Sequence, residues 1–286
     1  MFDATTNETQ AGASSRVCVY QPLARFLHLP RQLCSGVLNM KMAATSVPLA
    51  LLVAFSVARS ATAQTDNAFL TTDAVVGRMM QQDAVQSAQV GGYTATRHYV
   101  VLNGERKAEM LVEVKCANDG AKEFNIMSEE GSSIIRKDVL HKTLAEETEA
   151  SRRSPAANVD ISPANYEFRL MGKDRVNERP AYLLELTPKA SNRFLIDGKI
   201  WVDAVDYSVI RAEGRLARSP SFWVRSVQFV QAYQKVGPMW LAASTHAVIE
   251  TRVFGEAKLT IETSDYKLSP TIDRTAKAEY LAGLRR

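Results

Sequence analysis

From Tyr166 to Leu268 the sequence alternates between strand patterns and short turns, and this rhythm constrains the fold more than any other feature. Strand patterns occur at Tyr166–Met171, Ala181–Thr187, Asn192–Val202, Ser208–Leu216, Trp223–Lys235, Met239–Ile249 and Glu256–Leu268. The segments predicted as turns include Gly172–Glu178, Asp197-Gly198, Asp203–Asp206 and Val236-Gly237-Pro238. Connections this short cannot hold crossover helices, so they predict an antiparallel meander.

The first half mixes helical and strand patterns. Asp66–Ser87 has helical periodicity with Thr72 or Asp73 as N-cap, and we expect Gly91-Gly92 to end it. A second helix with one charged side is predicted over Ser132–Ser151, before a polar loop at Ser154–Pro163.

Three further strands lie between these helices. Tyr93–Leu102 and Lys107–Cys116 flank Asn103-Gly104, a dipeptide that favours a two-residue hairpin turn, and Lys122–Met127 follows. About ten strands and two helices predict a mainly β (α+β) domain. We expect a single curved antiparallel sheet that forms an unclosed half-barrel, with two helices covering the concave face.

The residues from Met40 onward have the order of a secretion signal. Lys41 supplies the positive charge, Val47–Val57 the apolar stretch and Ala61-Thr62-Ala63 a small-residue cleavage site. We expect cleavage near Ala63 and a periplasmic protein. The rival interpretation is a mitochondrial transit peptide, because the chain has no acidic residue between Thr9 and Thr65.

This leader divides the chain into four parts. Residues 1–39 are expected to be a mis-assigned or disordered extension, residues 40–63 the signal peptide, residues 64–270 the folded domain and residues 271–286 a polar tail.

Charge and cysteine content narrow the function. Five of the 35 basic and two of the 31 acidic residues precede residue 64, which leaves a net charge of +1 on the remainder and no footprint for nucleic acid. Cys18 and Cys34 lie in the leader, and Cys116 lies in a strand pattern, where we expect a buried side chain rather than a nucleophile.

Motifs for catalysis, metals or cofactors are absent from the sequence. His98, His141 and His246 have no metal-ligand spacing, and no GxSxG or phosphate-binding glycine loop occurs. The acidic groups Glu129-Glu130 and Glu146-Glu147-Glu149 are expected to be solvated surface. We therefore expect no enzyme, no cofactor and no metal; a hydrolase assembled from distant residues is the third-ranked alternative.

Aromatic and apolar residues of the second half suggest a binding surface. A strongly bent sheet is not fully covered by two helices, so part of its concave face can line an apolar cavity. The alternative is that these side chains only fill a core. The candidate lining residues are Tyr182, Leu184, Leu186, Phe194, Ile196, Trp201, Trp223, Phe229 and Trp240.

The element order and local motifs resemble the LolA-like family of lipoprotein carriers and the related lipoprotein-sensing domain of envelope-stress regulators. The resemblance lies in YLLELTPK (Tyr182–Lys189), FLIDGKIWVDAVDYSVIRAEG (Phe194–Gly214), KVGPMWLAAS (Lys235–Ser244) and YKL (Tyr266–Leu268). In this family an arginine holds the lid closed. It is not assigned to a residue of this chain, and Arg97 and Arg106 are the two candidates considered.

This resemblance implies a non-enzymatic protein that holds a lipid, an acyl chain or a lipidated protein in an apolar cavity, in outer-membrane lipoprotein sorting. The implied partners are lipid or lipoprotein acyl chains and an envelope membrane protein, and not nucleic acid. The alternative is a periplasmic sensor or protein-interaction module of an envelope-stress pathway.

Overall fold

The computed structural model describes residues 70–153, 160–253 and 255–270. The predicted extension, signal peptide, cleavage site and polar tail, and most of the loop at Ser154–Pro163, lie outside these residues. The described residues from Thr71 onward belong to one compact unit. None of the helices in these ranges is long and apolar enough to cross a membrane.

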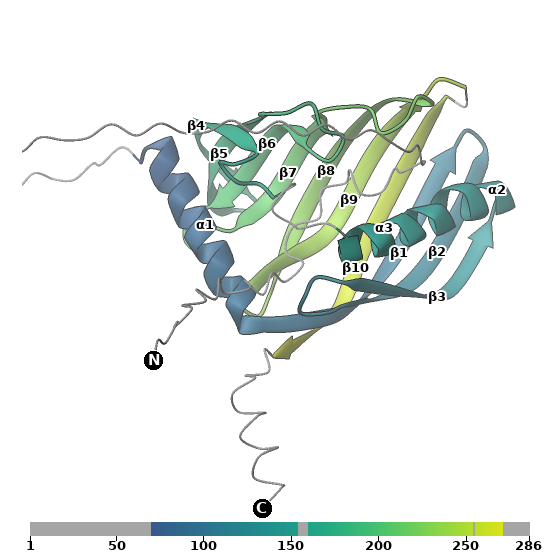
Figure 1. Cartoon of the computed structure of the whole chain (residues 1–286), viewed down its shortest axis with the longest axis horizontal. Coiled ribbons are helices and arrows are strands. Elements are labelled where there is room, and N and C mark those ends of the chain that lie inside the picture. Colours follow the sequence, from purple (N-terminus) through teal and green to yellow (C-terminus); the bar gives the residue numbers. More distant parts are fainter. Residues whose placement is uncertain (1–69, 154–159, 254, 271–286) are drawn as a thin grey trace, which may run out of the picture. The chain divides into compact units, whose positions relative to one another are not determined.

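The described residues form one antiparallel sheet of ten strands (Figure 1). The strands are β1 (Val90–Asn103), β2 (Arg106–Cys116), β3 (Lys122–Gly131), β4 (Tyr166–Val176), β5 (Arg179–Pro188), β6 (Ile196–Asp203), β7 (Val209–Leu216), β8 (Val224–Val236), β9 (Met239–Thr251) and β10 (Glu256–Pro270). Their order is β3-β2-β1-β10-β9-β8-β7-β6-β5-β4, so only β1 and β10 are neighbours that do not follow each other in sequence. The edge strands β3 and β4 do not pair, which confirms the predicted unclosed half-barrel.

Two helical segments lie on the same side of the sheet (Figure 1). The first is α1 (Thr72–Gln89); the second consists of α2 (Ser133–Ile135), the π-helical turn η2 (Arg136–His141) and α3 (Lys142–Arg153). Both segments were predicted. The N-cap of α1 is Thr71 rather than Thr72 or Asp73, because the Thr71 side chain accepts a hydrogen bond from the Ala74 amide at 3.2 Å.

Three predicted turns or breaks are wrong, and each contains a glycine that the sheet uses. The helix ends at Gln89, and Gly92 lies inside β1, where a Cβ would meet the Cys116 carbonyl oxygen. Gly172 lies at a register shift inside β4, and the true turn is Asn177-Glu178, both with positive φ. Asp197-Gly198 lies inside β6.

Gly198 and Gly214 face each other across β6 and β7 at very close range. A Cβ on Gly198 would lie 2.1 Å from the Glu213 carbonyl oxygen, and a Cβ on Gly214 would lie 2.3 Å from the Asp197 carbonyl oxygen. Because only glycine allows backbones this close, the pair is what lets β6 and β7 run together at this point.

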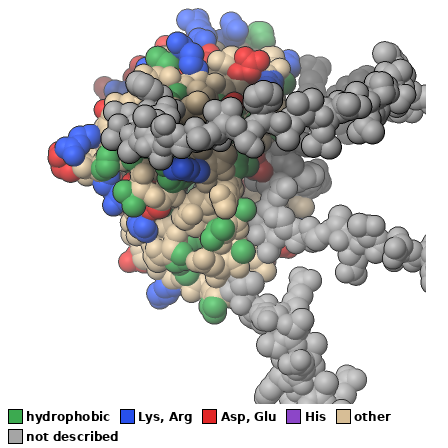
Figure 2. All heavy atoms as spheres, turned by 90° about the vertical axis from the view of Figure 1, so that its left-hand side faces the viewer, with side chains coloured by type: hydrophobic (Ala, Val, Ile, Leu, Met, Phe, Trp, Pro, Cys, Tyr) green, Lys and Arg blue, Asp and Glu red, His purple; other side chains and the backbone are tan. Residues whose placement is uncertain are grey.

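Alternation along the strands separates an inner face, which carries the helices, from an outer face. On the outer face, oppositely charged side chains pair across strands, as in Arg169 with Glu185 and Arg215 with Asp197. Figure 2 views the side of the domain that carries α1 and β4, where charges of both signs are mixed and hydrophobic side chains are scattered. The hydrophobic core therefore belongs to the inner face.

Gly198→Ala is expected to lower the free energy of unfolding by about 1–3 kcal/mol, because the new methyl group forces β7 backbone away. Chemical denaturation monitored by circular dichroism measures this. Gly77→Ala in α1 is the control: nothing lies within 4 Å of its Cβ position, so we expect a gain of about 0.5–1 kcal/mol. Equal effects at both sites would contradict the close approach.

Candidate functional site

The inner face is lined by side chains that the strand register brings into rows across the sheet. Directly opposed residues of antiparallel strands project to the same face, so each row can be followed from partner to partner. One row contains Leu184, Ile200, Ala212, Gln231, Thr245, Ile261, Tyr99 and Met110, and the next contains Leu186, Gly198, Gly214, Phe229, Ala247, Leu259, Val101 and Ala108. Apart from the two glycines, all of these residues are buried. The inner face is thus a continuous, mainly apolar surface.

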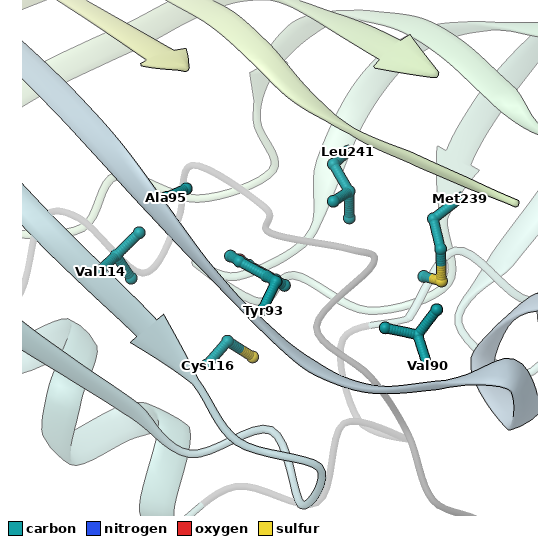
Figure 3. Close-up of a cluster of buried hydrophobic side chains, with 7 residues drawn as sticks. All are labelled: Val90, Tyr93, Ala95, Val114, Cys116, Met239 and Leu241. Atoms are coloured by element: carbon teal, nitrogen blue, oxygen red, sulfur yellow. The ribbon is translucent and has the colours of Figure 1, made fainter. Parts of the chain in front are cut away.

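At the end of the sheet where β1 begins, this surface continues into a compact cluster (Figure 3). Its members are Val90, Tyr93, Ala95, Val114, Cys116, Met239 and Leu241. The Tyr93 and Tyr266 rings meet edge to face, with centroids 5.3 Å apart, and burial raises the pKa of both phenols. The expected burial of Cys116 is confirmed.

Five of the nine predicted lining residues lie together on the inner face of β5, β6 and β8. They are Tyr182, Leu184, Leu186, Ile196 and Phe229, and all are buried. Phe194, just before β6, is half-buried, and the Arg193 guanidinium lies 5.1 Å from the centre of its ring. The three tryptophans lie in other environments.

Trp201 projects to the outer face. It is the partner of Leu183 and Arg211, whose neighbours Leu184 and Ala212 occupy the inner face. The Arg211 guanidinium stacks over the indole at 5.1 Å, and the indole Nε1 donates to Asp174 Oδ2 at 2.8 Å. This hydrogen bond lowers the pKa of Asp174 below its ordinary value.

Trp240 is buried against the β6–β7 turn, and Trp223 is exposed before β8. The Trp240 Nε1 donates to Asp206 Oδ2 at 3.0 Å, and Arg179 packs over its ring. Lys235 Nζ donates to the same Asp206 oxygen at 2.8 Å. Burial raises the pKa of Asp206, but these two hydrogen bonds, a third from the Ser208 amide and the charge of Lys235 together outweigh it and hold the pKa below the ordinary 3.8.

A buried group of three charges joins α3 to the sheet. Glu147 of α3 accepts hydrogen bonds through Oε1 from Arg97 Nη1 of β1 at 3.2 Å and from Lys122 Nζ of β3 at 2.9 Å. All three side chains are about 2% exposed or less. We call Arg97, Glu147 and Lys122 the buried charge triad.

Further contacts fix the triad in place. Arg97 Nη1 lies 3.3 Å from the Tyr99 hydroxyl, and its guanidinium packs over Phe124 at 5.7 Å. The Lys122 amide donates to the Ser151 hydroxyl at the end of α3. Two cations around one carboxylate compensate the desolvation of Glu147, which makes the triad the polar attachment of α3 to an otherwise apolar face.

The expectation that Glu147 is solvated is wrong, and a signal in the sequence pointed the other way. Arg97 occupies the inner-face parity of β1, between Ala95 and Tyr99. Glu147 follows Leu140 and Leu144 at helical spacing, so it shares their buried side. Arg97 interrupts the apolar side of its strand and Glu147 interrupts the apolar side of its helix, and this pattern indicates a buried ion pair.

A second polar cluster lies beneath η2. Glu129 of β3 accepts hydrogen bonds from Arg136 Nη1 at 2.8 Å and from His141 Nε2 at 2.5 Å. The His141 bond is the main cause of the lowered pKa of Glu129. Within the described residues, no group of three or more His, Cys, Asp and Glu side chains is arranged to hold a metal ion.

Comparison with known proteins matches residues 76–213 to the MucB/RseB N-terminal domain family. The match runs from Val76 in α1 to Glu213 in β7, so it spans most of α1, the second helical segment, β1 to β6 and most of β7. This match confirms the resemblance to the sensor domain of envelope-stress regulators that the sequence predicted. No curated protein matches the chain.

Several solved structures match this chain at low sequence identity. A DUF1329 family protein from Desulfovibrio piger is 12% identical, covers 70% of this chain and 93% of its own, and has a TM-score of 0.39. A putative outer membrane lipoprotein-sorting protein domain from Vibrio parahaemolyticus is 11% identical over 72% and 97%, with a TM-score of 0.36. A LolA superfamily protein from Nitrosomonas europaea is 12% identical over 71% and 96%, with a TM-score of 0.31. Because these TM-scores are low, the description of the fold is based on the observed strand order and not on these matches.

Glu147→Gln is expected to lower the free energy of unfolding by about 3–5 kcal/mol, because Arg97 and Lys122 lose the carboxylate between them. Denaturant titration measures the change. Arg152→Gln, at an exposed position of α3, is the control and is expected to change stability by less than about 0.5 kcal/mol. A neutral Glu147→Gln would show that the triad does not attach α3.

The lowered pKa of Asp206 makes part of the stability dependent on pH. The stabilisation is complete above the unfolded pKa, near 3.8, and is lost as the pH falls through the lower folded pKa. Between pH 5 and about 2, the free energy of unfolding should therefore fall less steeply in Asp206→Asn than in the wild type. Parallel pH profiles from denaturant titrations would contradict the assignment.

Proposed function

We propose, on the premise that this chain contains a LolA-like domain of the MucB/RseB type, that it is a non-enzymatic binding protein for an acyl chain. The acyl chain is proposed to lie on the inner face of the sheet, the face that carries the helices. The observation that carries the proposal is the continuous apolar inner face, on which α3 is attached through a buried charge triad. The leader pattern in the sequence supports a periplasmic location and a ligand from a membrane lipid or lipoprotein.

The contacts of the second helical segment suit a movable cover. Ile135, Leu140 and Leu144 are its buried apolar anchors, whereas Ile134 and Val139 are exposed. A segment with few buried apolar contacts opens locally at lower cost than the sheet beneath it. Opening separates the triad, and an acyl chain offsets that cost because each buried methylene contributes about 0.8 kcal/mol.

The proposed lining consists of the inner-face residues Tyr182, Leu184, Leu186, Ile196 and Phe229, together with Phe194. Phe229 is the most informative, because it lies between Gly214 and Ala247 and is the largest side chain in its row. A ligand on the inner face at this row contacts Phe229 rather than its small neighbours.

We expect the purified full chain to bind 11-(dansylamino)undecanoic acid, a fluorescent fatty acid, and to release lipid in native mass spectrometry. Phe229→Glu places a carboxylate in the apolar row and should weaken probe binding by at least tenfold, because a charge buried without a partner is costly. Phe222→Glu, at an exposed phenylalanine, is the matched control and should bind the probe like the wild type.

Circular dichroism must show that both variants are folded. Phe194→Glu, at a half-buried position, provides a second test if Phe229→Glu does not fold. A wild-type chain that carries no lipid and does not bind the probe would refute the acyl-chain proposal.

The family match favours a second function, a sensor module that binds an envelope membrane protein. Such a module uses the domain as a docking surface, and its inner face is filled by its own side chains. Co-purification of one membrane protein with a chain that carries no lipid would support this function over the first.

A further inference from the structure

Two adjacent loops at one end of the sheet expose a group of large apolar side chains. The loop between β7 and β8 carries Phe222 and Trp223, whose side chains are 72% and 54% exposed, and the β9–β10 connection carries Val253 at 61%. Large apolar side chains that cluster in water mark an interaction surface more often than single ones do. We call Phe222, Trp223, Arg252 and Val253 the aromatic tip.

The aromatic tip is held in shape by contacts between the two loops. The Arg252 amide donates to the Trp223 carbonyl oxygen at 2.9 Å, and Arg252 Nε donates to the Phe222 carbonyl oxygen at 2.7 Å. Its guanidinium also packs over the Phe222 ring at 5.1 Å, and the two aromatic rings meet edge to face at 5.3 Å. A group fixed in an outward position loses little conformational entropy when it binds a partner.

Positive charge surrounds the tip. Arg218, Arg225 and Arg252 are exposed, and residues 217–225 and 251–253 contain no acidic residue. Arg193 carries a further positive charge near Arg218: burial is the main cause that lowers the pKa of Arg193, Glu146 acts in the opposite direction, and the charge of Arg218 lowers the pKa further. The nearest acids along the chain are Glu250 and Glu256, and Glu256 pairs with Lys258.

We propose that the aromatic tip docks the domain on the surface of an anionic lipid bilayer. Tryptophan is enriched at the boundary between headgroups and acyl chains, phenylalanine can insert beside it as an apolar side chain, and arginine is attracted to anionic headgroups. The aromatic tip combines these groups on the β7–β8 and β9–β10 loops, at one end of the sheet. Trp223 and Phe222 enter the boundary, while the three arginines contact lipid phosphates.

This docking surface is separate from the proposed cargo site. Phe229 lies further along β8 and faces inward, whereas Phe222 and Trp223 precede the strand and face solvent. Loss of vesicle binding with probe binding intact, or the reverse, therefore tells which of the two proposals fails.

The tryptophans give a local measurement in the full chain. The sequence has three, and Trp201 and Trp240 are buried, so Trp223 is the one that a bilayer can reach. We expect its emission to shift to shorter wavelength with vesicles of phosphatidylglycerol and phosphatidylethanolamine, and to be quenched by brominated acyl chains. Vesicles of phosphatidylcholine alone should give a much smaller change, because they lack net negative charge.

Cosedimentation with the anionic vesicles tests the residues. Phe222→Ser with Trp223→Ser should reduce binding by about tenfold or more, through lost apolar burial. Arg218→Gln, Arg225→Gln and Arg252→Gln should each reduce it by about fivefold and weaken its salt dependence. Val205→Ser is the matched control, because Val205 is 73% exposed but lies in the β6–β7 turn.

Unchanged Trp223 emission, or equal vesicle binding by the wild type and the Phe222→Ser/Trp223→Ser variant, would refute the proposal. Equal binding of anionic and neutral vesicles would refute the part assigned to the arginines. If the tip instead captures a protein while vesicles leave Trp223 unaffected, the surface is a protein interface and the lipid proposal is wrong.

Discussion

The buried charge triad is the constraint on which the inner side of the domain depends. Glu147 joins α3 to both β1 and β3 through charge, and it does so on an inner face that is mainly apolar. A carboxylate in such surroundings is tolerated because two cations hold it. The triad therefore holds α3 against β1 and β3, in addition to the apolar contacts of Leu140 in η2 and Leu144 in α3.

The sheet beneath that helix depends on two features of its backbone. Pairing of β1 with β10 joins the N-terminal three strands to the C-terminal meander, and it brings Arg97 opposite Thr263 on the inner face. Close approach at Gly198 and Gly214 joins β6 and β7. Because the edges β3 and β4 do not pair with each other, the sheet is not closed into a barrel. An open sheet with an attached helix is the geometry that the proposed acyl-chain site requires.

The two faces of the sheet also separate two kinds of tryptophan environment. Trp201 is part of the charged outer face, where Asp174 and Arg211 hold it, and Trp240 anchors the β6–β7 turn through Asp206. Trp201 and Trp240 therefore stabilise the sheet and the β6–β7 turn. Trp223 belongs to the tip, at the end of the sheet, where the domain exposes apolar and positively charged groups together. Cargo binding and membrane docking can thus use different parts of one small domain.

Local pattern was enough to predict the helices and strands, because alternation and helical periodicity are properties of short segments. It failed at Gly172 and Asp197-Gly198, where a glycine usually signals a turn but here permits a bulge or a close approach of strands. The three proposed lining residues of β5 lie on the same face because they occupy alternate positions of one strand. Trp201 was assigned with Ile196 because both are apolar, although an odd and an even position of one strand face opposite ways.

By itself, the sequence determined that this chain forms an antiparallel, mainly β domain with two helical segments, since each element is defined by residues a few positions apart. Only the tertiary structure decided that β1 pairs with β10, that Glu147 meets Arg97 and Lys122, and that Phe222 and Arg252 form one tip. Those contacts join residues 25 to 180 positions apart. Bringing together residues so distant in the sequence depends on the packing of the whole sheet rather than on any local preference.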